Sequence, residues 1–117
     1  MKESILFEKS RNFAIEIIYL YKRLSEDKRE YVLSKQVLRS GTSIGANISE
    51  ARFAQSLNDF ISKMSISLKE ANETYYWIDL LMETGYIDDE AGEHLRIKCL
   101  ELIRMLQASV KTSKGKL

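Results

Sequence analysis

The sequence contains no proline, and it has one cysteine, one histidine and one tryptophan among its 117 residues. The absence of proline permits long uninterrupted helices, because proline removes a backbone N–H and breaks a helix interior. The lone Cys99 cannot form an internal disulfide, which fits a reducing cytoplasm. A single histidine argues against a di-iron bundle, because such sites need Glu-x-x-His on two helices. These scarcities together predict a cytoplasmic, helical protein without a metal centre.

Long apolar runs are also missing. None approaches the ~20 residues that a membrane-spanning helix needs, and the residues after Met1 lack the apolar core of a signal peptide. The composition, 44% apolar and 30% charged, is that of an ordinary globular protein. We therefore expect one domain over residues 1–117, large enough for a real core and without membrane contact.

Apolar residues recur at three- and four-residue steps in four segments, the period of amphipathic helices. We expect helices over Ser4 to about Leu24, Tyr31 to Phe53, Ser56 to Gly85, and Asp88 to Val110. The polar tail over 110–117 is expected to fray. Four amphipathic helices with short connections pack best as an up-down-up-down bundle. The sequence therefore predicts an all-α four-helix bundle.

Several helix ends are marked by residue type. Ser56 followed by Asp59 predicts a capping arrangement, and Asp88 is a suitable N-cap for the last helix. Gly85 predicts a left-handed residue at the end of the third helix. The polar segment 25–30 leaves two interpretations open, since it suits either a connection or the charged first turn of the second helix.

Gly41 and Gly45 lie four residues apart within the apolar arc of the second helix. Each costs roughly 1 kcal/mol relative to alanine inside a helix. Two such residues on a packing face predict a close approach of another helix, because no side chain holds the backbones apart.

Motifs for catalysis or ligand binding are absent. The sequence has no Gly-x-Ser-x-Gly elbow, no glycine-rich phosphate loop and no zinc-type cysteine spacing. Cys99 falls in an apolar stripe, where cysteine is usually a small core residue. Glu70 and Glu73 share a helix face without a histidine partner, and the residue three before His94 is Ala91. We expect no enzyme activity, no cofactor, no metal and no small-molecule substrate.

One polar constellation lies away from the apolar stripes. On the second helix it comprises Ser43, Asn47 and Glu50. On the third helix Glu70, Glu73 and Trp77 share a face with two aliphatic residues, Ile66 and Leu80. One interpretation is a bundle that wraps the third helix more fully. The other is an interface between subunits, with the tryptophan as an anchor.

Charge is unevenly distributed although the net charge is only +1. Residues 59–93 hold nine acidic groups against two basic, whereas residues 94–117 hold six basic against one acidic. This pattern suits either neighbouring helices of opposite sign or a basic surface that binds phosphate. The cations of such a surface would be Lys28, Arg29, Lys35, Arg39, Arg52, Arg96, Lys98, Arg104, Lys111, Lys114 and Lys116.

Two runs resemble a known family. The run from Gln36 to Ala51, QVLRSGTSIGANISEA, is similar to the signature of the bacterial four-helix-bundle family, also called the 23S rRNA intervening-sequence or S23 family. The run from Asn58 to Trp77, NDFISKMSISLKEANETYYW, resembles its second signature. Together the resemblance covers nearly the whole chain.

The resemblance implies a four-helix bundle that assembles into a ring, as a homopentamer. It also implies kinship with the accessory protein of diversity-generating retroelements, a basic barrel that engages nucleic acid and a reverse transcriptase. The near-neutral charge of this chain favours the plain intervening-sequence branch.

Three functions stay open from the sequence. The first is a non-enzymatic homo-oligomer that binds RNA, DNA or a nucleic-acid enzyme through its basic edges. The second is an adaptor that binds only protein, in which the charges serve solubility. The third is an enzyme that uses the glutamate cluster. The sequence has no catalytic motif of its own, and the family resemblance favours the first.

Overall fold

The structure, a computed structural model, describes residues 2–117, with side chains described from Ile5 onward. Every element in this part of the chain is helical. The elements are α1 (Lys2–Lys22), the π-helical turn η1 (Arg23–Asp27), α2 (Leu33–Ala51), α3 (Leu57–Glu83) and α4 (Asp89–Lys114).

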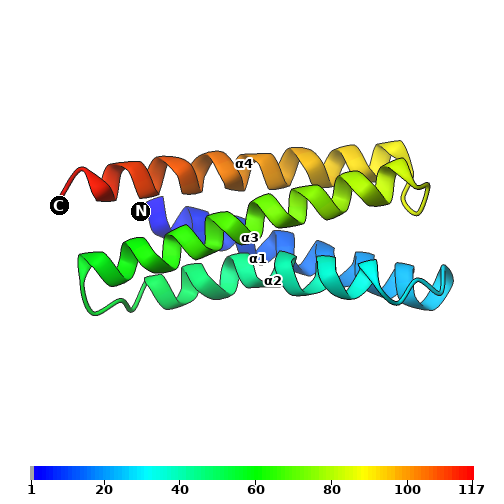
Figure 1. Ribbon diagram of the computed structural model, residues 1–117, viewed down its shortest axis with the longest axis horizontal. Helices are drawn as coiled ribbons and strands as arrows, with labels where there is room; N and C mark the ends of the chain where they lie inside the picture. The colour runs from blue at the N-terminus through cyan, green and yellow to red at the C-terminus, as the bar shows by residue number, and fades with distance from the viewer. Residues whose placement is uncertain (1) are drawn as a thin grey trace.

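The four long helices run up, down, up and down in an elongated bundle of 47 × 20 × 20 Å (Figure 1). Both chain ends lie at one end of the bundle, with the α2–α3 connection, and the other two connections lie at the opposite end. Consecutive helices pack along their lengths, whereas α1 and α4 close the bundle more loosely. The predicted all-α four-helix bundle is therefore confirmed. No described helix combines the length and apolar character needed to cross a membrane.

The core runs along the bundle axis and draws on all four helices. Its largest fully buried side chains are Phe13, Ile17, Leu20, Leu24, Val37, Ile44, Ile48, Met64, Ile78, Leu81, Leu102 and Leu106. Burial of each such side chain contributes roughly 1.5–3 kcal/mol. The core is thus continuous, as expected for one hydrophobic domain.

Buried hydroxyl groups join α2 to α3. Ser67 donates to the carbonyl oxygen of Ile44 at 2.8 Å, and Thr74 donates to the hydroxyl of Ser40 at 2.9 Å. A buried hydroxyl with a partner avoids the cost of an unsatisfied polar group. The buried stripe of α3 therefore includes Ser67 and Thr74 in addition to apolar residues spaced at helical steps.

The predicted helix ends at the later connections are confirmed. Ser56 accepts from the Asp59 amide at 3.0 Å, and Asp88 accepts from the Ala91 amide at 2.8 Å. Gly85 has a φ of 80°, in the left-handed region. The Tyr86 amide returns to the Leu81 carbonyl at 2.9 Å, which closes the end of α3 as a Schellman turn.

Two boundaries differ from the sequence-based expectation. The first helix does not end at Leu24, because η1 continues it to Asp27 and leaves residues 28–32 as the connection. The tail over 110–117 is not frayed along its length, because α4 continues to Lys114 and buries Ser113. The last turn is held because Ser113 packs into the bundle, which a polar sequence does not reveal.

Candidate functional site

The surface of α2 and α3 is organised by Arg39. Its Nη1 atom donates to Glu70 Oε2 at 3.0 Å, and its Nη2 atom binds Glu73 Oε2. The indole Nε1 of Trp77 donates to the same Glu73 oxygen at 2.9 Å. The ring of Tyr76 meets the Trp77 ring edge-on, with centroids 5.2 Å apart. We call these five residues the Arg39–Trp77 network.

The Arg39–Trp77 network fixes geometry more than it stabilises the fold. The Arg39 side chain is 50% exposed, and an exposed ion pair contributes only about 0–1 kcal/mol. Two carboxylates nevertheless hold the guanidinium, and one of them orients the half-buried indole. Arg39 was predicted as a phosphate-binding cation. Its two glutamate partners instead place it in the polar cluster of α3.

The predicted polar residues of α2 lie outside this network. Ser43 donates to the Arg39 carbonyl at 2.6 Å, and Asn47 donates to the Ser43 carbonyl at 2.9 Å, so both bond within their own helix. Glu50 lies 3.4 Å from Lys63 of α3 in an exposed ion pair. The structure therefore divides the predicted constellation into the Arg39–Trp77 network and a separate row along α2.

Gly41 and Gly45 bring α2 against α1. A Cβ atom at Gly41 would lie 2.8 Å from Cγ2 of buried Ile17, and one at Gly45 would lie 3.1 Å from the Ser10 hydroxyl. The sequence analysis missed a third such position, Gly92 of α4, where a Cβ atom would overlap Met82 of α3. The sequence signal for this position is that Gly92, a poor helix former, stands inside a segment predicted to be helical.

Two further candidate cations have partners within the chain. The Arg52 guanidinium lies over the Phe7 ring, 4.4 Å from its centroid. Arg96 donates to Asp79 at 3.3 Å and lies over the Tyr75 ring. Like Arg39, these arginines are engaged at helix–helix contacts and offer less of their charge to an external phosphate.

The remaining candidate cations have no acidic partner among the described side chains. Except for Lys98 and Arg104, which lie farther in along α4, they gather at the two ends of the bundle (Figure 1). The first cationic cluster, at the α1–α2 connection, comprises Lys28, Arg29 and Lys35. The second cationic cluster extends along the C-terminal half of α4 and just past it, and comprises Arg104, Lys111, Lys114 and Lys116. All of these side chains are exposed.

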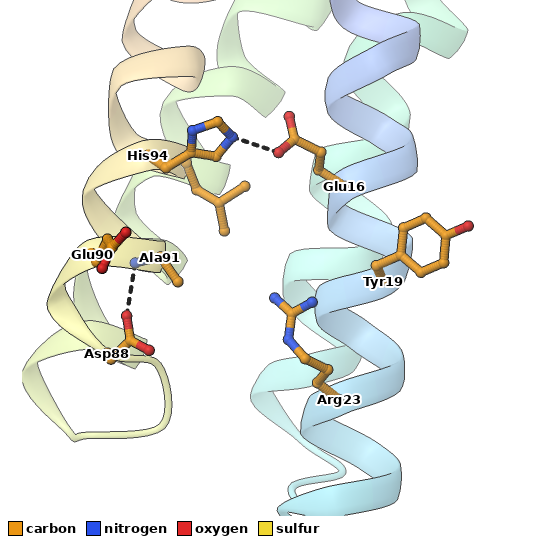
Figure 2. A pocket seen from close by; sticks show the side chains of 8 residues that line it. Glu16, Tyr19, Arg23, Asp88, Glu90, Ala91 and His94 are labelled. Carbon is orange, nitrogen blue, oxygen red and sulfur yellow. Dashed lines mark hydrogen bonds and ion pairs between the residues drawn. The ribbon is translucent and has the colours of Figure 1, made fainter.

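A cavity of about 590 Å³ opens where α1 and α4 diverge, and the sequence analysis did not find it. Figure 2 shows His94 of α4 and Glu16 of α1 facing each other across it, with Nε2 and Oε1 2.6 Å apart. Arg23 and Asp88 also line it, nearer the connections at this end of the bundle. Because Glu16 and His94 lie 78 residues apart, no spacing within one helix could have predicted the pair.

The cavity does not form a recognisable catalytic site. Its lining mixes carboxylates, an arginine and an imidazole without a nucleophile held by a base. The described residues contain no group of three or more His, Cys, Asp or Glu side chains that could hold a metal. Burial raises the pKa of Cys99 to about 12, so its thiol is protonated and inert at neutral pH.

Comparison with known proteins places the chain among helical bundles of undefined activity. A solved structure from Bacteroides thetaiotaomicron, described as a protein of unknown function from the S23 ribosomal protein family, is 50% identical and superposes with a TM-score of 0.93. The match covers 95% of this chain and 99% of the other. The curated proteins contain no match. The model of the 23S rRNA-intervening sequence protein family matches residues 2–108. The chain therefore belongs to the 23S rRNA-intervening sequence protein family.

Proposed function

We propose that this protein is a non-enzymatic homo-oligomer that binds nucleic acid through its two cationic clusters. The supporting observation is that its candidate cations fall into two groups, those with a partner in the chain and those without one. Arg39, Arg52 and Arg96 engage partners between helices, whereas six candidate cations without an acidic partner among the described side chains lie toward the ends of the bundle: Lys28, Arg29, Lys35, Lys111, Lys114 and Lys116. Lysine and arginine side chains that neutralise phosphates release counterions from the nucleic-acid backbone, which favours binding.

The second cationic cluster has the stronger local field. From residue 102 to the C-terminus the chain has four cations and no acidic residue. Because α4 stays helical to Lys114, Lys111 lies two turns beyond Arg104 and one turn before Lys114. Such a row projects from one side of a rigid helix. A preorganised row loses less conformational entropy on binding than a frayed tail would.

Oligomerisation would multiply this modest charge. The face that presents Trp77 also exposes Tyr76 and Ile66, an aromatic and aliphatic surface suited to a second subunit. Repeated cationic ends in one assembly would raise affinity by multivalency, without any new contact within a subunit. The ring expected from the family resemblance is one such assembly.

Gel shifts with structured RNA across a salt series test the proposal. We expect binding at low salt that weakens steeply as salt rises. Changing Lys111, Lys114 and Lys116 together to glutamine should weaken binding and flatten the salt slope by about 2–3, roughly one per lost phosphate contact.

The matched control changes Lys9, Lys63 and Lys69 to glutamine. This variant loses the same total charge from positions outside the clusters. It should keep most of the affinity if the location of charge matters. No binding at low salt, or equal losses in both variants, would contradict the proposal.

The Tyr76–Trp77 surface also favours a second candidate function, that of an adaptor for a protein partner. An adaptor needs no nucleic acid, so its captured partner should survive nuclease treatment. In that case Trp77→Ala should release the partner, and the lysine triple variant should retain it.

A further inference from the structure

Two helices of this chain end on a left-handed residue, and the chain fills the two positions differently. α3 ends on Gly85, with a φ of 80°. The π-turn that extends α1 ends before Arg29, with a φ of 53°, and Arg29 is the one non-glycine residue with positive φ in the described chain. Glycine adopts this conformation without a steric penalty, whereas an arginine Cβ crowds the backbone.

The conformation of Arg29 is imposed by its surroundings. The Lys28 amide donates to the Arg23 carbonyl at 3.2 Å, and the Glu30 amide donates to the Leu24 carbonyl at 2.9 Å. Both bonds close the end of α1 around Arg29. Its exposed side chain makes no ion pair with the described side chains. A residue in a sparsely populated backbone conformation, whose exposed side chain forms no ion pair with the described side chains, is a candidate for an external contact.

The connection after Arg29 is held by hydrogen bonds between Glu30 and the first turn of α2, which we call the clamp. The Glu30 carboxylate accepts from the amides of Leu33 and Ser34 at 3.1 and 2.7 Å. Buried Ser34 in return donates its hydroxyl to the Glu30 carbonyl at 2.6 Å. Between these fixed points, Tyr31 is 54% exposed and Val32 is 70% exposed. The clamp therefore presents a ring to solvent on a short and well-defined connection.

The clamp also excludes a phosphate from the N-terminus of α2. Helix N-termini commonly bind anions through free amides. At α2 the Glu30 carboxylate already occupies those amides. The cations left for an incoming phosphate are the exposed side chains of Lys28, Arg29 and Lys35, which are near the exposed Tyr31 in the sequence, as are the carboxylates of Glu26 and Asp27.

We infer that the α1–α2 connection binds unpaired nucleotides, with a base stacked on Tyr31 and the adjoining phosphates held by Lys28 and Arg29. Exposed aromatic rings beside cations are the usual means of holding single strands, since every base offers a face for stacking. A duplex hides those faces, so this site prefers single-stranded segments. The inference rests on the proposed nucleic-acid binding and assigns one of its two clusters to unpaired bases.

The test compares a single-stranded oligonucleotide with a duplex of the same sequence. Tyr31→Ala should weaken binding of the single strand roughly tenfold and leave the duplex nearly unchanged. Tyr31→Phe keeps the ring and should retain the affinity. Ile97→Ala is the control, because Ile97 is an apolar residue that is 61% exposed on α4, outside both cationic clusters.

Arg29→Gly supplies an independent readout. Glycine adopts the left-handed conformation of residue 29 without strain. The melting temperature should therefore stay unchanged or rise by roughly 2–4 °C. The same change should weaken single-strand binding and flatten its salt slope by about 1. A purely structural role for Arg29 would predict no loss of binding.

The outcomes separate this inference from the proposed function. A wild type that binds neither oligonucleotide at low salt would overturn both. A wild type that binds, while Tyr31→Ala and Arg29→Gly bind the single strand equally well, would overturn the inference alone. In that case the exposed connection would be assigned to a protein partner.

Discussion

The close approach of α2 to α1 at Gly41 depends on the absence of a side chain there. A methyl group there would meet the branched side chain of Ile17, which is fully buried and cannot swing aside. We expect Gly41→Ala to lower the free energy of unfolding by about 1 kcal/mol. An overpacking cost of roughly 1–3 kcal/mol exceeds the gain in helix propensity of about 1 kcal/mol. Thermal or urea denaturation measures the change.

The control for Gly41→Ala is Ser62→Ala on the exposed side of α3. A substitution there should stay within about 0.5 kcal/mol of the wild type. Equal or increased stability of Gly41→Ala would show that α1 and α2 do not need this close approach.

The thiol of Cys99 is expected to be unreactive in the native protein. Its thiol is buried in the core and donates to the Ala71 carbonyl at 3.2 Å. Alkylation at neutral pH should therefore proceed only through unfolding, and mass spectrometry should show complete labelling in denaturant. Rapid labelling in native buffer would contradict the burial of this residue.

The pKa of Cys99 also has a stability consequence. Burial raises it from 9.0 to about 12, so the folded chain holds this proton more tightly than the unfolded chain. The associated stability is present below pH 9 and is lost as pH rises toward 12. The stability difference between wild type and Cys99→Ala should therefore shrink over that range.

At the scale of elements, the end of α4 decides whether the second cationic cluster is ordered. The amide of Gly115 donates to the Lys111 carbonyl at 3.2 Å, and Ser113 is buried. Amide exchange of the C-terminal peptide should accordingly be slowed roughly tenfold or more relative to an unstructured chain. Ser113→Asp should remove this protection, because it would bury a charge. Exchange at the intrinsic rate in the wild type would instead support a frayed tail.

The periodicity of α3 predicted part of its buried face. Ile61, Met64, Ala71 and Ile78 are buried, as their spacing at helical steps indicates. That spacing could not place the polar residues Ser67 and Thr74 in the core. The reason is that α2 supplies hydrogen-bond acceptors opposite the two hydroxyls. The spacing of apolar residues predicts which apolar side chains are buried. It does not predict the burial of a polar side chain whose hydrogen-bond partner lies on a neighbouring helix.

At the scale of the whole molecule, Trp77 links the bundle to its proposed assembly. Trp77→Ala should lower the oligomer mass measured by light scattering, because the indole anchors the Tyr76–Trp77 surface. Tyr86→Ala is the control, since Tyr86 is exposed at a connection outside that surface. An unchanged mass, or a monomeric wild type, would contradict the proposed subunit interface.

The candidate site was predictable only in its parts. The sequence indicated Glu70, Glu73 and Trp77 as one face of α3, because these positions share a helical side. It assigned Arg39 to a different role, since a pairing across 31 and 34 residues requires knowledge of which helices are neighbours. The pair of Glu16 and His94 was missed for the same reason.

The sequence by itself determined the four helices, most of their ends and their antiparallel order. These depend on local propensity, capping and apolar period, which are properties of neighbouring residues. Only the tertiary structure decided which cations are paired, how far α4 extends and that Arg29 is left-handed. The first two outcomes depend on atoms brought together from distant segments, and the third accompanies the hydrogen bond from the Glu30 amide to the Leu24 carbonyl that closes the end of α1.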